Sequence, residues 1–154
     1  MTIAPSVSAE DPSGADALAL VAELSAALTA ITGASGQASF DVADVTGPRA
    51  CFAIARDAHG RALGCGALRP LEVDVAEIKR MFARPGMRGV GAAVLRFLEA
   101  EAARCGYVAL RLSTRRVNER AVAFYERHGY RRIPGYGRYA GSQVSACFEK
   151  VLTA

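Results

Sequence analysis

The spacing of hydrophobic positions predicts three helices. Apolar residues recur every three or four positions from Leu18 to Ile31, which is typical of one face of a helix, and glycines 33 and 36 follow it. Similar stripes predict helices over 92–104 and 118–128, each followed by a glycine. The first stripe consists of Leu18, Val21, Leu24, Ala27, Leu28 and Ile31.

Apolar or alternating stretches predict the strands. Cys51–Arg56 and Arg61–Leu68 flank a turn at 57–60 and predict a β-hairpin. The segment 73–83 predicts a third strand with charged residues on both faces, so one face must look into a cleft or the strand must be short. Alternation places Glu77, Lys79 and Met81 on one face and Ile78, Arg80 and Phe82 on the other. Further strands are predicted at 107–113, 130–133 and 144–152.

Length and composition suit one globular domain. The chain has 154 residues, of which 51% are hydrophobic and 22% charged. Residues 1–13 are rich in Ser, Pro and Asp and are predicted to be a flexible N-terminus, which leaves 14–154 as a single domain. The order of helices and strands predicts a mixed α/β or α+β fold, with loops at 34–48 and 134–143.

Charge and cysteine usage exclude several classes. With 19 Lys and Arg against 15 Asp and Glu, the charge is too even to predict nucleic-acid binding and favours a small anion such as a phosphorylated cofactor. No uninterrupted apolar run of about 18 residues predicts a membrane span, and residues 1–14 do not read as a signal peptide. Neither the four cysteines nor the two histidines form a zinc pattern, so we expect no metal and a reducing, cytoplasmic setting.

A glycine-rich loop at 84–91 precedes the second helix. The free backbone N–H groups and the dipole at a helix N-terminus suit a phosphate, and Arg88 adds a fork of donors. The P-loop and dinucleotide patterns both fail, since no Lys-Ser or Lys-Thr follows and Val94 stands at the last glycine position. A tight turn without a ligand is the alternative.

The segment Asn118–Tyr130 resembles the second conserved block of the GCN5-related N-acetyltransferase (GNAT) superfamily, N-x-x-A-x-x-F/L-Y-x-x-x-G-F/Y. The order of elements is similar over roughly residues 15–152, and segments 64–69, 76–85 and 147–150 look like those of one bacterial subgroup with a single small domain. The matching residues are Asn118, Ala121, Phe124, Tyr125, Gly129 and Tyr130.

The resemblance implies an α+β fold with a central, mostly antiparallel twisted sheet, a V-shaped splay between its middle strands and about four flanking helices. It also implies an acetyl-CoA-dependent N-acetyltransferase that moves the acetyl group directly to a primary amine of a small molecule, with amino acids or related metabolites as candidates. The alternatives are an acyl-CoA-binding or sensor module without turnover and an enzyme that acetylates protein or peptide amines. Neither nucleic acid nor membrane is an expected partner, and a homodimer stays open.

The glycine-rich loop is similar to the family's pyrophosphate loop, Q/R-x-x-G-x-G/A. In one alignment to this pattern Arg88, Gly91 and Ala93 fill the three defined positions. In the other alignment Gly89-Val90-Gly91 forms the final G-x-G. The apolar pattern of the following helix favours the second alignment, in which Arg88 takes the role of the family's Gln or Arg. The resemblance further implies that the end of the third strand lends backbone groups to the pantetheine arm. The implied cofactor contacts are Met81, Phe82, Ala83, Met87, Arg88, Gly89, Val90, Gly91, Ala92, Asn118, Ala121 and Tyr125.

Two residues are the implied catalytic groups. Tyr125 stands where the family has the proton donor to the thiolate, and the alternative is a core tyrosine bonded to backbone. Glu77 is the candidate base, directly or through water, and the alternative is an ion pair with Lys79 or an arginine. Asn118 either orients the cofactor or only caps its helix. The acceptor is set by loops 34–48 and 134–143, with Lys79, Arg80, Tyr136 and Tyr139 as candidate contacts.

Overall fold

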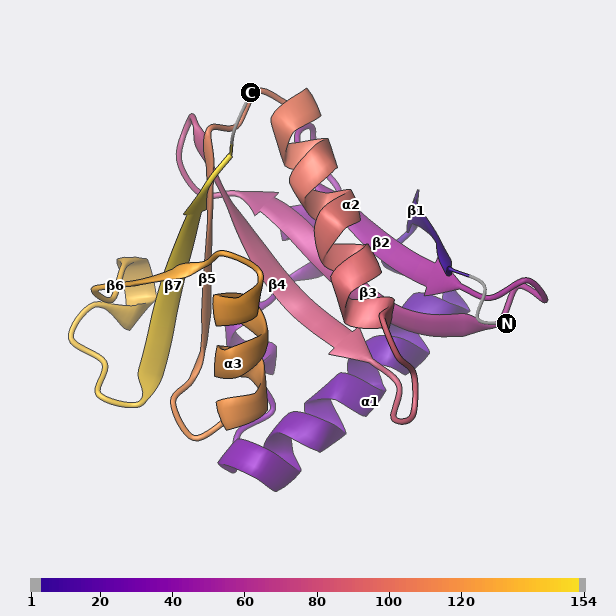
Figure 1. Cartoon of the computed structure of the whole chain (residues 1–154), viewed down its shortest axis with the longest axis horizontal. Coiled ribbons are helices and arrows are strands. Elements are labelled where there is room, and N and C mark those ends of the chain that lie inside the picture. The colour runs from indigo at the N-terminus through magenta and orange to yellow at the C-terminus, as the bar shows by residue number, and fades with distance from the viewer. Residues whose placement is uncertain (1–3, 153–154) are drawn as a thin grey trace.

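A seven-stranded sheet runs through residues 4–152, the part of the chain that the computed structural model describes (Figure 1). The strands are β1 (Ser6–Glu10), β2 (Cys51–Arg56), β3 (Ala62–Pro70), β4 (Val75–Ala83), β5 (Ala109–Arg115), β6 (Arg131–Ile133) and β7 (Ser145–Val151). The helices are α1 (Ala15–Thr32), α2 (Val90–Arg104) and α3 (Glu119–Arg127), with 3-10 turns η1 (Gln37–Ser39), η2 (Val42–Val45) and η3 (Gly137–Tyr139). The strand order is β1-β2-β3-β4-β5-β7-β6, and all neighbours are antiparallel except β4 and β5.

Helices cover both faces of this sheet, which confirms the α+β class. α2 and α3 lie on one face and α1 lies on the other (Figure 1). On the first face, Val94, Leu95 and Leu98 of α2 pack with buried β5 and β7 residues in one apolar cluster. On the second face, Ala17 and Leu20 of α1 join a separate cluster with side chains of β2 and β3.

Glycines on β3 let α2 approach the sheet closely. A Cβ on Gly66 would lie 2.5 Å from the sulfur of Met81 and 2.8 Å from Cγ1 of Val94. A Cβ on Gly64 would lie 2.5 Å from the Phe82 carbonyl oxygen. The glycine content of β3 therefore reflects helix–sheet packing.

The two parallel middle strands separate along their length. β4 pairs with β5 only from Val75 to Glu77, opposite Ala109 to Arg111. Beyond that point β5 continues to pair with β7, whereas β4 keeps only its β3 partner. This split is the V-shaped opening that the resemblance implies.

A β-bulge in β4 changes which residues share a face. Cys65 pairs with Phe82 and Ala67 with Lys79, so Gly66 stands opposite two residues, Arg80 and Met81. Arg80 takes the left-handed conformation with φ 54°. Met81 therefore packs in the α2 cluster and Phe82 in the α1 cluster, the reverse of simple alternation, so the predicted faces are wrong beyond the bulge.

The N-terminal segment predicted to be flexible contains strand β1. Ser6–Glu10 pairs antiparallel with β2, and Glu10 accepts hydrogen bonds of 2.8 and 2.7 Å from the Arg56 guanidinium. No alternating pattern marks this strand because none of its five residues is buried. Residues 1–3 lie outside the described residues.

Helix α1 forms where it is predicted and packs most of the predicted stripe against the sheet. Leu24 of that stripe is buried and Val21, Ala27 and Leu28 are half-buried, whereas Leu18 is 54% exposed and Ile31 48% exposed. Ala17, Leu20 and Ser25 are buried as well, so the packed face is shifted from the one predicted at its N-terminal end. By length and composition α1 could also span a membrane, a test that core helices of folded domains pass as well.

Two other expectations about helices need correction. Within residues 4–152 three α-helices flank the sheet instead of about four, since the segment after α1 contains only the short turns η1 and η2. α2 begins at Val90, two residues before the predicted start, because Gly89 with φ 76° forms its N-cap.

Candidate functional site

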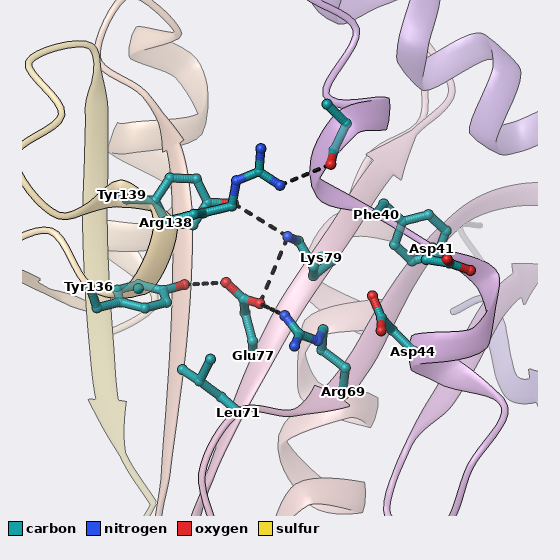
Figure 2. A pocket seen from close by; sticks show the side chains of 12 residues that line it. Phe40, Asp41, Asp44, Arg69, Leu71, Glu77, Lys79, Tyr136, Arg138 and Tyr139 are labelled. Carbon is teal, nitrogen blue, oxygen red and sulfur yellow. Dashed lines mark hydrogen bonds and ion pairs between the residues drawn. The ribbon is translucent and has the colours of Figure 1, made fainter.

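A pocket of about 420 Å³ opens on the α1 face of the sheet (Figure 2). Its walls are the α1–β2 loop and the β6–β7 loop, and β3 and β4 supply its floor. The Arg138 Nη1 donates to the Ala38 carbonyl oxygen at 2.9 Å and joins the two loops. The two loops predicted to set the acceptor therefore line one pocket. Its lining is Ala38, Phe40, Asp41, Asp44, Arg69, Leu71, Glu77, Lys79, Tyr136, Gly137, Arg138 and Tyr139.

Glu77 lies on the floor of this pocket with its side chain only 2% exposed. The Arg69 Nη1 donates to Oε1 of Glu77 at 2.6 Å, and the Tyr136 hydroxyl donates to Oε2 at 2.5 Å. The Lys79 Nζ lies 3.8 Å from Oε1. These donors compensate the burial of a carboxylate, and the predicted ion pair with an arginine is present.

Tyrosines of the β6–β7 loop form one wall. The rings of Tyr136 and Tyr139 meet edge to face with centroids 5.5 Å apart, and the Lys79 Nζ donates to the Tyr139 hydroxyl at 3.3 Å. Burial, and next the charge of Glu77, raises the pKa of Tyr136, so its phenol stays protonated and donates to Glu77. Three of the four predicted acceptor contacts thus lie together in the pocket.

The opposite wall is acidic. Asp41 caps η2 by accepting a 2.9 Å hydrogen bond from the Ala43 N–H, and Asp44 lies beside it in the lining. Within residues 4–152 neither aspartate forms a salt bridge. The ionisable lining consists of the acids Asp41, Asp44 and Glu77 and the bases Arg69, Lys79 and Arg138, so its formal charges cancel.

Arg80, the fourth predicted acceptor contact, does not line this pocket. The bulge turns its guanidinium under α1, where it is 7% exposed and donates to the Val21 carbonyl and the Ser25 hydroxyl. A guanidinium held in this way faces no open space of the pocket. The prediction failed because alternation does not reveal a bulge.

The other face of the sheet carries the glycine-rich loop and the start of α2. The helix begins at Val90 after the Gly89 cap, and no side chain caps its first N–H groups. Arg88 is exposed and makes no hydrogen bond or ion pair within residues 4–152. A Cβ on Gly91 would lie 3.4 Å from the Phe124 ring, so the start of α2 abuts α3. The predicted anion site therefore has uncapped helix N–H donors and an exposed arginine beside them.

The end of β4 leads toward this helix terminus. Phe82 and Ala83 pair with β3 on one side, and in the described part of the chain no strand occupies the other side. The backbone groups of Met81–Ala83 that face the split thus lack ladder partners, which leaves an edge that an extended ligand could extend.

Tyr125 of α3 lies in the α2-face cluster and is 8% exposed. Its ring packs edge to face on Tyr130 with centroids 5.8 Å apart. Burial raises the pKa of Tyr125, so the phenol stays protonated. Tyr125 therefore packs in the core, as the structural alternative expects, but its hydroxyl has no hydrogen-bond partner within residues 4–152, so the expected bond to backbone is absent.

Asn118 is the N-cap of α3. Its side-chain oxygen accepts a 3.3 Å hydrogen bond from the Ala121 N–H. The capping role is therefore present, and a role toward the cofactor stays a prediction. Ala121 itself packs against the core beside Tyr125.

Sequence reasoning missed several lining residues. Phe40, Asp41 and Asp44 belong to a loop without apolar periodicity, and Arg138 lies in a glycine-rich loop. The start of the turn at Asp41 carried one usable signal, since aspartate is a preferred cap. Nothing in the sequence alone shows that these loops, about 100 residues apart, meet.

Comparison with known proteins agrees with this architecture. The acetyltransferase (GNAT) family model matches residues 21–130. An uncharacterized N-acetyltransferase of Schizosaccharomyces pombe is 34% identical over 92 residues, and the match spans 58% of this chain and 56% of that relative.

Solved structures extend the likeness over the whole fold. A Klebsiella pneumoniae protein assigned as an acyl-CoA N-acyltransferase has a TM-score of 0.83 and 28% identity, over 97% of this chain and 98% of its own. A GNAT family acetyltransferase from Elizabethkingia anophelis, solved with acetyl-CoA bound, has a TM-score of 0.71 and 13% identity, over 98% and 100%. With its split sheet and Asn118–Tyr130 block, the chain belongs to the acetyltransferase (GNAT) family.

Proposed function

We propose that this protein is an acetyl-CoA-dependent N-acetyltransferase of a small primary amine. The observation that carries the proposal is the split between β4 and β5, which has different chemistry on its two faces. The face with α2 and α3 offers free helix N–H groups and a protonated phenol, Tyr125. The face with α1 offers a charged pocket around Glu77. Two substrates can therefore approach one opening from opposite sides.

Acetyl-CoA suits the α2 face. The N–H groups and dipole of the first turn of α2 favour a pyrophosphate, and Arg88 is available to pair with phosphate oxygens. The open edge of Met81–Ala83 can accept the amides of a pantetheine arm as an added strand. The Elizabethkingia relative was solved with acetyl-CoA, which supports this assignment.

The reaction is a direct transfer between the two faces. The acceptor nitrogen reacts as a neutral amine, so a bound ammonium first loses one proton to solvent. The nitrogen then forms a bond to the thioester carbonyl carbon, the carbon–sulfur bond breaks, and the nitrogen loses one further proton. Tyr125, whose phenol is neutral at pH 7 and whose pKa is raised further by burial, donates a proton to the leaving thiolate. Glu77 receives the amine proton, directly or through water, while Arg69 and Tyr136 fix the orientation of its carboxylate.

The pocket favours a small polar acceptor. A volume of about 420 Å³ is at the lower end of small-molecule sites. Its acidic wall can hold an ammonium group, and its basic side chains can hold a carboxylate, so amino acids and related amines fit its charges. The Arg138 to Ala38 contact bridges the pocket, which argues against an open groove for a peptide.

Two assays test the proposal in sequence. Saturating acetyl-CoA should raise the melting temperature by about 5–11 °C, the effect of ~2.7 kcal/mol at a hundred times Kd, with dephospho-CoA and an Arg88→Ala variant giving smaller shifts. Thiol release should then respond to small amines in a panel that includes amino acids, diamines and lysine-containing peptides. The absence of any shift at millimolar acetyl-CoA would refute cofactor binding. Binding without thiol release from any amine would favour the non-catalytic module, and release only with peptides would favour a protein-modifying enzyme.

A further inference from the structure

The segment of β4 beyond Glu77 is held on one side only. β3 pairs with it, but β5 no longer does, so its position determines the width of the split. Within this segment Arg80 adopts φ 54°, one of two non-glycine residues with positive φ in residues 4–152. A left-handed arginine persists only when its surroundings hold it there.

The side chain of Arg80 supplies that hold. Its Nη1 donates to the Ser35 carbonyl at 3.1 Å, and its Nη2 donates to the Val21 carbonyl at 3.2 Å and to the Ser25 hydroxyl at 2.5 Å. The guanidinium thus ties β4 to the middle of α1 and to the segment that follows α1. No carboxylate lies within 4.0 Å of it among residues 4–152.

Burial of this cation is costly. Arg80 is 7% exposed, burial lowers its pKa, and its Nε has no partner in the described part of the chain. A methionine or leucine would fill such a space without an unpaired donor. The presence of a guanidinium at this buried position therefore indicates that its hydrogen bonds, and not only the volume it fills, serve a function.

The tethered segments are the two halves of the proposed site. Lys79, directly before Arg80, lines the pocket, and Met81–Ala83, directly after it, form the open edge. The tethered loop continues into Phe40, whose ring lies 5.8 Å from the Arg80 guanidinium carbon and lines the same pocket. A Cβ on Gly36 would lie 2.9 Å from the Arg80 Nη1, so this loop is shaped around the guanidinium.

We infer that Arg80 is a positioning residue that couples the acetyl-CoA edge of β4 to the acceptor wall formed by residues 34–45. The inference rests on the proposed function. Binding of acetyl-CoA along β4 fixes the strand, and the Arg80 hydrogen bonds transmit that order to the acceptor wall on the opposite face. Arg80 contacts neither substrate and acts through the strand and the loop.

The chain offers a matched control in Arg49. Arg49 also has positive φ, 61°, and its guanidinium donates to the carbonyls of Cys105 at 3.0 Å and Val73 at 2.9 Å. It is not among the residues that line the pocket. Arg49→Met therefore removes a comparable tether with the same backbone strain away from the split.

The experiment measures acetyl-CoA affinity by calorimetry and amide exchange by mass spectrometry, with and without acetyl-CoA. In wild type and Arg49→Met, acetyl-CoA should slow exchange in residues 34–45. In Arg80→Met this protection should vanish, and the Kd should rise by about two- to thirtyfold, the range of measured coupling energies. Arg80→Lys should show an intermediate loss of protection and an intermediate Kd, because one ammonium cannot donate to three separated acceptors. This variant replaces Arg80→Met in the experiment if Arg80→Met does not fold.

Two results overturn the inference. One is an Arg80→Met protein that keeps both the protection and a Kd within about twofold of wild type, below the range of coupling energies. The other is an Arg49→Met protein that shows the same loss of protection and the same rise in Kd as Arg80→Met. The effect would then follow from a general loss of stability. A wild-type protein that binds no acetyl-CoA would instead refute the proposed function, so the two failures are distinguishable.

Discussion

Tyr125→Phe separates catalysis from folding in this protein. The change removes one oxygen atom from a buried ring whose hydroxyl has no hydrogen-bond partner within residues 4–152. Because no protein hydrogen bond is lost, the free energy of unfolding should change by less than about 0.5 kcal/mol. If the phenol protonates the leaving thiolate, kcat should fall by about 10²–10⁴-fold, which corresponds to roughly 3–5 kcal/mol in the activation barrier.

Tyr130→Phe is the matched control from the same aromatic cluster. The Tyr130 hydroxyl donates to Oε2 of Glu99 at 2.8 Å, and the Lys150 Nζ donates to the same oxygen at 3.1 Å. Loss of a hydrogen bond to a charged group costs about 1.5–3 kcal/mol, which lowers the melting temperature by roughly 3–12 °C in a domain of this size. Turnover should stay near wild type while the protein is folded.

The assay combines thermal melts, acetyl-CoA calorimetry and thiol release with the best amine of the panel. Turnover should fall only in Tyr125→Phe and stability only in Tyr130→Phe, with acetyl-CoA affinity near wild type in both. A Tyr125→Phe enzyme with more than about a tenth of wild-type kcat would refute the proton-donor role, since that loss is below the range for general acid catalysis. A marked loss of stability in Tyr125→Phe would show that its hydroxyl has a structural partner.

Three further outcomes follow from the structure. Gly66→Ala places a methyl group 2.5 Å from the Met81 sulfur and should destabilise the fold by about 1–3 kcal/mol, whereas Gly47→Ala, with open space around it, should change stability little. Thermal melts compare the two variants, and equal melting temperatures would contradict close packing of α2 on Gly66. Glu77→Gln should lower kcat/KM for the amine by about 10²-fold or more and leave the Kd for acetyl-CoA unchanged, because Glu77 faces the other side of the sheet; steady-state kinetics and calorimetry decide. Burial raises the pKa of Tyr125 above its ordinary value of 10, so its phenol stays protonated in alkaline solution and kcat should not decline between pH 7 and pH 9. A decline in kcat over this range that Tyr125→Phe abolishes would contradict the raised pKa.

The sequence was most informative where local chemistry decides the structure. Apolar periodicity located α2 and α3, and glycines marked their ends, because a helix buries one stripe and stops at a residue that tolerates positive φ. The block around Tyr125 was enough to identify the fold. The ion pair of Glu77 could also be anticipated, since a buried carboxylate in a strand needs a cation.

Features that depend on contacts between distant segments were not predictable. Strand β1 gains its stability from β2 and from Arg56 and not from an alternating pattern of its own. The position of Arg80 depends on one extra residue opposite Gly66, which reverses the alternation and leaves no trace in the local sequence. The pocket itself forms only because the fold brings the α1–β2 and β6–β7 loops together.

The contact between Arg138 and the Ala38 carbonyl also bears on how such a protein diversifies. The walls of the proposed acceptor pocket are loops that contribute no residue to the ladder between β4 and β5, so insertions or exchanges there leave the split and its register intact. Selection for a new amine can therefore act on two short segments while the donor half of the reaction is inherited unchanged. Because these loops lie apart from the β4–β5 ladder, they are also suitable positions for a library of variants selected for activity on another acceptor.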